Sequence, residues 1–408
     1  MKYRILTKTL KKAITTFPAV VVTGPRQSGK TTLLKSLFSR THAYYNLENP
    51  DVRLRAKDDP KSFLNHLKLP VIIDEIQYVP ELVSFIKDRI DKKRKPGEWL
   101  MTGSQNFILM QGVSESLAGR AAVLSLLPFT LAERLGRGET SKDVTRLLGA
   151  RPQGKDATHA PQALQELIMR GNYPEIASNR KVDRNLWCGS YITTYLERDI
   201  RTLTHVGDLA QFERFLRICA TRTGQILNIS DFARDVGTTV TTAKRWLSLM
   251  ETGYQIYLLY PYYRNIGKRL VKSPKLYFND TALVCYLLGL QDDQSLLNSP
   301  YFPALFETMI VTDFYKRFLH FGQLPSLYYL KTRDGLEVDL AVELNQKLHL
   351  FEIKSSATIT PQHAASVGRA RNDLDALVAS AGIISLDEER FMVRDDIVNH
   401  HWLQFLSL

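Results

Sequence analysis

The sequence predicts an α/β protein with more than one domain, and three observations support this expectation. The chain has 408 residues, enough for two or three domains at roughly 150 residues each. Its first third alternates short apolar runs with helix-like stretches, a pattern typical of a parallel sheet covered by helices. Its last third again contains strand-like runs in which apolar and polar residues alternate. We expect domains at residues 1–200, 201–282 and 283–408.

The composition is that of a folded globular chain. Hydrophobic residues make up 44% and charged residues 24%, which excludes wholesale disorder and fibrous repeats. The longest apolar stretch, at 121–127, falls short of the ~18 residues that cross a bilayer. No apolar signal segment follows Met1. We therefore expect a cytoplasmic protein without a membrane partner.

Cysteine content and charge add two expectations. The three cysteines are widely spaced and form no Cys-x-x-Cys pair, which favours reduced core thiols over metal ligands. They are Cys188, Cys219 and Cys285. The 54 Lys and Arg residues exceed the 42 Asp and Glu residues, for a net charge of +12. This balance favours contact with a polyanion such as nucleic acid but does not establish it.

The first segment contains five apolar runs that we expect to form the strands of the parallel sheet. The runs lie at 19–22, 43–47, 71–73, 99–101 and 121–126. The stretch 133–163 then turns polar and rich in glycine, proline and charge, which predicts a solvated insertion or linker.

A glycine-bearing motif follows the first of these runs. Residues 24–31 fit G-x-x-x-x-G-K-[ST] between a strand and a helix, the pattern of a P-loop. The glycines let backbone N–H groups converge on phosphate oxygens, Lys30 reaches the β- and γ-phosphates, and Thr31 binds Mg²⁺. The residues expected around the phosphates are Gly24, Pro25, Arg26, Gln27, Ser28, Gly29, Lys30, Thr31 and Thr32. A chance glycine loop is the structural alternative.

Two carboxylates end the buried run at 71–73. We expect Asp74 to hold the Mg²⁺ through water. Glu75 is expected to orient or deprotonate the attacking water, the general-base role of a hydrolase. An N-cap of the helix expected at 81–90 is the alternative for either acid.

A polar residue after the run at 99–101 is expected to contact the γ-phosphate or the attacking water. Ser104 is the first candidate for this role and Gln105 is the second. A plain strand-to-loop turn at Gly103 is the alternative.

At this point the chain resembles a known group, the prokaryotic ATPases of the AAA superfamily that carry a C-terminal domain of unknown function, DUF4143. The resemblance spans nearly the whole chain and rests on short segments at 22–32, 73–77, 102–104, 117–120, 195–200 and 306–307. It implies an AAA-type ATPase core that uses ATP. By resemblance to AAA ATPases, Arg120 would reach the γ-phosphate of a neighbouring subunit in a homo-oligomer. A surface salt bridge is the alternative for Arg120.

A helix-turn-helix pattern is expected in the centre, after a largely helical stretch at 164–219. Ser230 is the expected N-cap of the first helix, and Gly237 is the left-handed residue that ends it. The second helix, at about 239–252, places apolar residues at intervals of three and four: Val240, Ala243, Leu247, Met250 and Tyr254. Its opposite face carries Thr241, Thr242, Lys244, Arg245 and Ser248.

Strands are expected at 256–260 and 275–278 with basic residues between them, as in a winged helix. The basic residues are Arg264, Lys268, Arg269 and Lys272. In this hypothesis the second helix enters the major groove of double-stranded DNA and the wing contacts phosphates. A protein-docking module is the alternative, because solvent also favours a polar helix face.

Two alternating runs near the C-terminus carry acidic residues. Over 337–343, the expected faces are Glu337, Asp339 and Glu343 on one side and Val338, Leu340 and Val342 on the other. Over 348–354, Glu352 and Lys354 share a face. If the two runs pair as a hairpin, Asp339 joins Glu352 and Lys354.

This arrangement resembles the PD-(D/E)xK nuclease core. The resemblance implies that Asp339 and Glu352 hold Mg²⁺, that Lys354 stabilises developing charge, and that Glu307 is a further ligand. No proline precedes Asp339, which departs from the pattern. Such cores are reused without cleavage activity, so nuclease activity stays open, and an exposed charged strand pair is the alternative.

Together these observations predict a Mg²⁺-dependent ATPase that couples its nucleotide state to a winged helix and a nuclease-like α/β module acting on DNA. A nucleotide-gated protein-interaction module, without DNA binding or cleavage, is the second hypothesis. A metal-dependent nuclease with a regulatory nucleotide site is the third. Stimulation of ATP turnover by DNA distinguishes the first hypothesis from the second.

Overall fold

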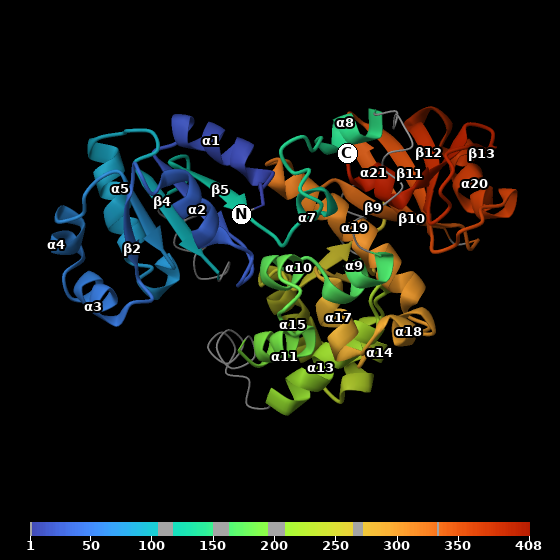
Figure 1. The fold of residues 1–408 in the computed structure, drawn as a ribbon, viewed down its shortest axis with the longest axis horizontal. Coiled ribbons are helices and arrows are strands. Elements are labelled where there is room, and N and C mark those ends of the chain that lie inside the picture. The colour runs from blue at the N-terminus through green and yellow to red at the C-terminus, as the bar shows by residue number, and fades with distance from the viewer. Residues whose placement is uncertain (1, 105–116, 150–162, 195–208, 264–271, 333) are drawn as a thin grey trace.

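The computed structural model describes residues 2–104, 117–149, 163–194, 209–263, 272–332 and 334–408 (Figure 1). The candidate Gln105 and the segment 195–200 lie outside these residues. The basic residues Arg264, Lys268 and Arg269 of the expected wing lie outside them as well. Within the described ranges, no helix has the length and apolar content to span a bilayer.

The N-terminal unit is a five-stranded parallel sheet with the strand order β2-β3-β4-β1-β5. Its strands are β1 (Ala19–Thr23), β2 (Ala43–Asn46), β3 (Val71–Asp74), β4 (Trp99–Gly103) and β5 (Ala121–Ser125). All five expected strands form, and the predicted parallel α/β unit is confirmed.

Helices cover both faces of this sheet (Figure 1). On one face, Val20 and Val22 of β1 pack with α1 and α2. On the other face, Val21 packs with α3, α4 and α5. These helices are α1 (Leu6–Thr16), α2 (Lys30–Phe38), α3 (Pro50–Asp58), α4 (Pro60–Asn65) and α5 (Leu82–Lys92). Because successive strand residues face opposite sides, an unbroken apolar run is buried by both layers.

The prediction of a solvated linker at 133–163 is wrong over the described part of that segment. Two short helices, α7 (Leu131–Arg134) and α8 (Val144–Gly149), form there. Glu133 is fully buried, makes a capping box with Thr130 and pairs with Arg4 at 3.2 Å. Glu133 can be buried because its carboxylate has partners, which sequence polarity alone does not reveal.

The central unit is mostly helical, as predicted. Its helices are α9 (Leu164–Arg170), α10 (Pro174–Ser178), α11 (Arg184–Thr194), α13 (Leu209–Thr221), α14 (Ile229–Val236), α15 (Val240–Thr252), α17 (Thr281–Leu287) and α18 (Asp293–Leu297). A small antiparallel sheet with the order β6-β8-β7 adjoins the pair α14 and α15. Its strands are β6 (Gln225–Ile226), β7 (Ile256–Leu259) and β8 (Lys275–Phe278).

Two details of the helix pair differ from the prediction. The side chain of Asn228, and not that of Ser230, caps α14 by accepting hydrogen bonds from two backbone N–H groups. Val240 is 37% exposed, because it is the first residue of α15 and lies at the end of the apolar face. Gly237 ends α14 with a φ of 77°, as predicted.

The C-terminal unit is a six-stranded mixed sheet with the order β13-β14-β12-β11-β10-β9. Its strands are β9 (Leu327–Lys331), β10 (Glu337–Leu344), β11 (Lys347–Lys354), β12 (Val378–Ser385), β13 (Met392–Arg394) and β14 (Ile397–His401). The helices around it are α19 (Phe302–His320), α20 (Ala365–Leu374) and α21 (Trp402–Leu406). This unit is α/β, as predicted.

The predicted hairpin forms from β10 and β11, and Asn345 and Gln346 turn the chain with positive φ angles of 50° and 61°. The predicted strict alternation in β10 is wrong. A β-bulge lies between Val338 and Ala341, so Val338 packs with Ala341 in one cluster while Leu340 packs in another. An extra residue in one strand shifts every later side chain to the other face.

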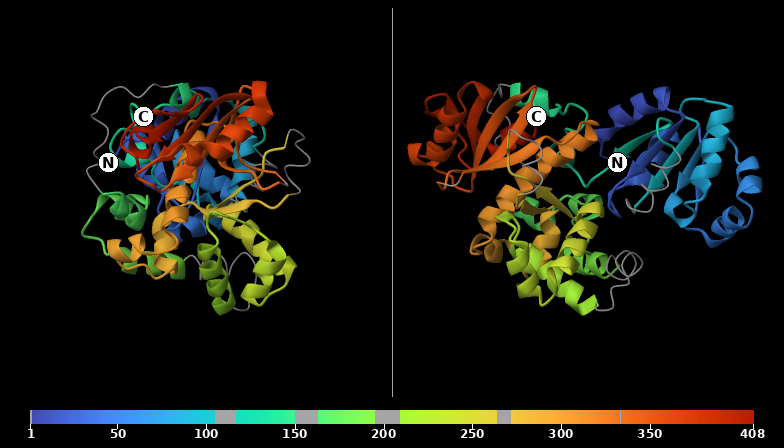
Figure 2. Two further views of the ribbon diagram at one scale, coloured as in Figure 1. Left: turned by 90° about the vertical axis from the view of Figure 1, so that its right-hand side faces the viewer. Right: turned by 180° about the vertical axis from the view of Figure 1, so that it is seen from behind.

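One hydrophobic core joins the central and C-terminal units. It extends from Leu131 to Leu406 and includes residues of α13, α15, α17, α19 and β11. Figures 1 and 2 show the N-terminal sheet at one end of the molecule and the C-terminal sheet at the other, with the orange α19 between them. The boundaries at 200/201 and 282/283 stay predictions.

Candidate functional site

A tight turn joins β1 to α2 at the carboxyl edge of the N-terminal sheet. Gly24 has a φ of 141°, and a Cβ atom there would lie 2.1 Å from the carbonyl oxygen of Leu126. Gly29, directly before α2, has a φ of 93°. A side chain is excluded at Gly24 by space and disfavoured at Gly29 by backbone conformation. The turn therefore has the shape that the two glycines predict.

Lys30 is the first residue of α2 and is 5% exposed. Its ammonium donates to the carbonyl oxygens of Gly24 at 2.9 Å and Pro25 at 2.8 Å. The free N–H groups at the start of α2 favour an anion at this turn. Of the other predicted loop residues, Pro25 and Ser28 are buried, Arg26 is half-buried, and Gln27 and Thr32 are exposed.

Asp74, the last residue of β3, is surrounded by hydroxyl groups. The Thr31 hydroxyl lies 2.9 Å from both carboxylate oxygens, the Tyr44 hydroxyl donates at 2.6 Å, and Thr102 donates as well. Burial and the hydrogen bond to Asp74 raise the pKa of Tyr44. The adjacent hydroxyl and carboxylate of Thr31 and Asp74 are hard oxygen donors of the kind that Mg²⁺ takes in nucleotide sites.

Glu75 has a left-handed backbone with a φ of 57°. Its N–H donates to the Thr102 hydroxyl at 3.0 Å. Its carboxylate accepts hydrogen bonds from the Ser104 hydroxyl at 3.2 Å and from the Gln77 amide, which also lies 3.1 Å from Ser104. The N-cap residue of α5 is Glu81, so neither Asp74 nor Glu75 is the cap proposed as their alternative role.

Strand order explains why these residues meet. β4 lies between β1 and β3, so the end of β4 places Ser104 between the turn at Gly24 and the carboxylates of β3. Tyr44, Gln77 and Thr102 belong to the same site but were not identified from the sequence. The available signal was their position: Tyr44 and Thr102 lie on the two strands that neighbour β3, and Gln77 lies three residues after its end.

A buried cluster of charges lies beneath the turn. Arg4 donates to the carbonyl oxygens of Ser28 at 2.7 Å and Leu127 at 2.5 Å. It also pairs with Glu133, which accepts a 2.6 Å hydrogen bond from the N–H of Ile5. Although burial opposes ionisation, Arg4 and His320 hold the pKa of Glu133 down to about 2. The shape of the turn thus depends on charges distant in sequence.

Tyr254, between α15 and β7, connects the N-terminal sheet to the central unit. Its hydroxyl lies 2.9 Å from the Thr23 hydroxyl at the end of β1 and 3.0 Å from the Ser125 hydroxyl at the end of β5. Thr23 directly precedes Gly24, so this contact lies at the base of the phosphate-binding turn. The sequence predicts Tyr254 only as part of an apolar helix face.

Arg120 lies away from this site. It precedes β5 and therefore sits at the amino edge of the parallel sheet, opposite the turn. Its guanidinium pairs with both carboxylate oxygens of Asp91 on α5, at 2.5 and 3.0 Å. This is the surface salt bridge that was the alternative to a catalytic role.

On α15, Thr241, Lys244 and Arg245 are exposed. Thr242 is half-buried, and its hydroxyl accepts a hydrogen bond from Thr239, the N-cap of the helix. Three of the four residues predicted to meet DNA are therefore open to solvent, and the fourth takes part in the helix cap.

The C-terminal acids meet as predicted, but around a lysine that the sequence analysis did not identify. Lys275 of β8 pairs with three carboxylates: Glu337 at 2.8 Å, Glu307 at 3.4 Å and Asp339 at 3.5 Å. Asp339 also accepts a 2.9 Å hydrogen bond from the N–H of Ile353. We call Glu307, Glu337, Asp339 and Glu352 the carboxylate cluster.

Glu352 and Lys354 lie at the edge of this cluster and pair with each other at 2.6 Å. Burial and the nearby Asp339 raise the pKa values of Glu307 and Glu352 to about 7. Across the described part of the chain, no group of three or more His, Cys, Asp or Glu side chains is arranged to hold a metal ion. The predicted Mg²⁺ ligands Glu307, Asp339 and Glu352 thus come together without a metal-binding arrangement, and Lys275 engages two of them.

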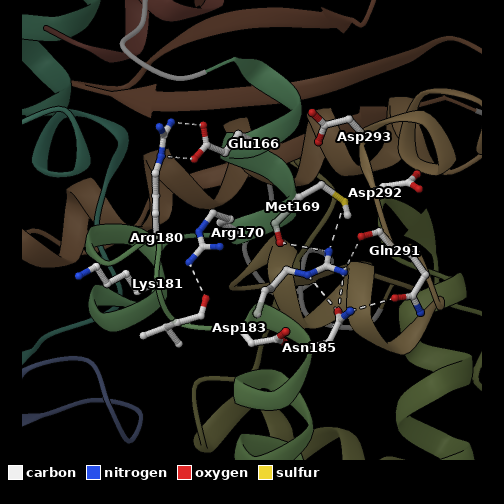
Figure 3. A pocket seen from close by; sticks show the side chains of 12 residues that line it. Glu166, Met169, Arg170, Arg180, Lys181, Asp183, Asn185, Gln291, Asp292 and Asp293 are labelled. Atoms are coloured by element: carbon white, nitrogen blue, oxygen red, sulfur yellow. Dashed lines mark hydrogen bonds and ion pairs between the residues drawn. The ribbon is translucent and has the colours of Figure 1, made fainter.

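A separate cavity of about 580 Å³ lies in the central unit and contains none of the predicted site residues. Figure 3 shows Arg180 and Glu166 facing one another at its lining. Arg180 pairs with Glu166, and Arg184 donates to the carbonyl oxygen of Leu290 at 2.7 Å. Arg180 and Arg184 are therefore held by other groups of the protein and have a structural role.

Comparisons with known proteins agree with this organisation. The family described as AAA domain matches residues 16–135, a domain of unknown function (DUF8612) matches 161–294, and a domain of unknown function (DUF4143) matches 302–403. The uncharacterized proteins Rv2008c of Mycobacterium tuberculosis and Mb2031c of Mycobacterium bovis are each 32% identical over 392 residues. These alignments cover 95% of this chain and 81% of each relative.

Two solved structures are similar at low identity. The Walker-type ATPase PABY2304 of Pyrococcus abyssi is 14% identical, with a TM-score of 0.44, over 69% of this chain and 94% of that one. The RuvB Holliday junction branch migration motor of Thermotoga maritima is 17% identical, with a TM-score of 0.28, over 62% of this chain and 88% of that one. On the family matches and the mycobacterial relatives, the chain belongs to the prokaryotic AAA-superfamily ATPases that carry a DUF4143 domain.

Proposed function

We propose that this ATPase hydrolyses ATP with Mg²⁺ and transmits its nucleotide state to a central DNA-binding unit. The observation that carries the proposal is the meeting of Lys30, Thr31, Asp74, Glu75 and Ser104 at one edge of the sheet. These residues supply a phosphate turn, oxygen donors for a cation and a base in one place.

Each residue has a distinct task in this proposal. Lys30 exchanges the carbonyl oxygens of its own loop for the β- and γ-phosphates of ATP, and the start of α2 adds backbone donors. Thr31 and Asp74 would hold Mg²⁺, which neutralises charge that develops between the two phosphates. Tyr44 and Thr102 keep the Asp74 carboxylate in place through their hydrogen bonds.

Glu75 is the general base in this proposal. It takes a proton from the attacking water, and Ser104 and Gln77 fix the orientation of its carboxylate. The left-handed backbone at Glu75 is unusual for a residue with a long side chain, and such backbones gather at functional sites.

DNA is the proposed partner of the central unit. Lys244 and Arg245 are adjacent exposed cations on α15, the second helix of a pair followed by an antiparallel sheet, as in a winged helix. The net charge of +12 favours the same partner. In this arrangement the side chains of α15 contact a duplex, and the sheet supports the helix.

The proposal is tested by steady-state ATP hydrolysis with Mg²⁺ or EDTA, and with or without double-stranded DNA at low salt. We expect turnover to require Mg²⁺ and to rise with DNA. In the double variant Lys244→Ala/Arg245→Ala the rise should be lost, and the salt dependence of DNA affinity should fall by about one phosphate contact per residue removed.

The matched control is Lys11→Ala/Lys12→Ala, which removes two adjacent exposed cations from α1. This variant should keep the stimulation by DNA. Turnover that is indifferent to DNA in the wild-type protein would contradict the proposed partner while leaving ATP hydrolysis intact.

Tyr254→Phe tests the coupling between the two units. The change removes the hydroxyl that contacts Thr23 and Ser125 but keeps the buried ring. We expect the ratio of DNA-stimulated to basal turnover to fall several-fold, because the turn and α15 lose a direct connection. Tyr257→Phe, which removes a hydroxyl from the adjoining strand β7, is the control and should keep the wild-type ratio.

A further inference from the structure

The placement of Lys275 is unusual for a lysine. It lies on β8, its side chain is 3% exposed, and three carboxylates of the C-terminal unit surround its ammonium at 2.8 to 3.5 Å. The Tyr329 ring lies 5.6 Å away. A buried ammonium is stable only where its hydrogen bonds and charge are satisfied, and here these partners satisfy both.

The lysine and its partners belong to different parts of the chain. Lys275 comes from the small sheet of the central unit, whereas Glu307 comes from α19 and Glu337 and Asp339 come from β10. The ion pairs therefore join the central unit to the C-terminal unit in the interior of the protein. These contacts are made by side chains, so they are separate from the backbone hydrogen bonds that hold the helices and strands.

The same oxygens are the ones that a divalent cation would need. Asp339 and Glu307 are the predicted metal ligands, and both have an oxygen within 3.5 Å of the Lys275 ammonium. One further oxygen, Oε2 of Glu352, is buried and has no hydrogen-bond partner among the described residues. An ammonium and a divalent ion cannot occupy one set of oxygens, because their charges repel at this distance.

We propose that Lys275 is the resident cation of the carboxylate cluster and excludes divalent metal from it for as long as β8 stays against the C-terminal sheet. The ion pairs of Lys275 with Glu307, Glu337 and Asp339 then hold the central unit against the C-terminal unit, and we call these ion pairs the lock. Metal enters only when Lys275 leaves the cluster. This inference goes beyond the proposed ATPase function, because it concerns a site that is not part of the phosphate turn.

The position of β8 suggests what could withdraw the lysine. Lys275 is paired with Leu259 at the end of β7, and β7 begins two residues after Tyr254, which contacts the ends of β1 and β5. A strand of four residues thus separates the contact with the ATPase sheet from the lock.

The test is Mn²⁺ binding to nucleotide-free protein, measured from the loss of the free-ion EPR signal. Wild type and Asp339→Asn should bind the same amount of Mn²⁺, because the cluster is closed to metal. Lys275→Met should gain one site with at least tenfold higher affinity than any site in wild type, and Lys275→Met/Asp339→Asn should lose it. Lys331→Met, which removes an exposed lysine that pairs with Glu337 at 3.0 Å, is the control and should gain no site.

Two results would overturn the inference. One is a Mn²⁺ site in wild type that disappears in Asp339→Asn. The other is a folded Lys275→Met protein, as judged by its circular dichroism, that binds no additional Mn²⁺. If Lys275→Met does not fold, the comparison of wild type with Asp339→Asn still tests the inference, because equal Mn²⁺ binding supports it and a loss of binding contradicts it. None of these measurements depends on ATP hydrolysis, so they can fail while the proposed function holds.

Discussion

Glu75→Gln lowers the rate of ATP hydrolysis by about 10²–10⁴-fold, the usual contribution of a general base. Glutamine has nearly the shape of glutamate and can still accept a hydrogen bond from Ser104, but it cannot take a proton from water. Phosphate release under saturating ATP and Mg²⁺ measures the loss. Binding of a fluorescent ATP analogue should stay within a few-fold of wild type, because the turn and Lys30 are untouched.

Glu81→Gln is the matched control for this experiment. Glu81 is an exposed acid six residues further along the chain, and its side chain caps no helix. It should hydrolyse ATP at the wild-type rate. A Glu75→Gln protein that keeps more than about a tenth of wild-type turnover would rule out Glu75 as the base, since a lost base costs at least about 10²-fold.

Glu133→Ala has the largest expected effect on stability. Glu133 is fully buried, and its removal leaves Arg4, which is 3% exposed, without its carboxylate partner. Breaking a buried ion pair on one side costs about 3–5 kcal/mol. Urea-induced unfolding at neutral pH measures this loss. Glu139→Ala, at an exposed acid in the same segment, should change the free energy of unfolding by less than about 0.5 kcal/mol.

The contribution of Glu133 to stability should depend on pH, and the direction of this dependence follows from the pKa of its carboxyl group. The pKa of Glu133 is lowered from an ordinary value of 4.5 to about 2 in the folded protein. A carboxylate with a lowered pKa stabilises the fold above its unfolded pKa, and that contribution is lost as the pH falls from about 4.5 towards 2. The stability difference between wild type and Glu133→Ala should therefore shrink over this interval. A difference that is constant with pH would contradict the assigned pairing.

The ATPase half of the site could be predicted from the sequence because its signals are local. The turn at Gly24, the carboxylates at Asp74 and the strand runs each lie within a few consecutive residues. Because the carboxyl ends of parallel strands lie at one edge of the sheet, these segments are then expected to meet. Ser104 could be placed beside Glu75 for the same reason, since both follow strands of that sheet.

The remaining residues depend on contacts between distant segments. Arg4 and Glu133 are 129 positions apart, and Lys275 and Asp339 are 64 apart. No periodic pattern marks such pairs. The buried state of Glu133 contradicted the polarity of its surroundings, and the bulge in β10 interrupted an alternation that looked regular in the sequence. In both cases tertiary partners outweighed the local pattern.

The core that extends from Leu131 to Leu406 determines where the protein can be cut. A fragment that begins near residue 302 would keep α19 but lose residues of the central unit that pack against it, such as Tyr257 of β7, whose ring stacks on that of Tyr315 at 4.1 Å. Exposed aromatic surface of that kind leads to aggregation. We therefore expect the DUF4143 segment to need the central unit for its stability, and trials with shortened proteins should keep the two joined.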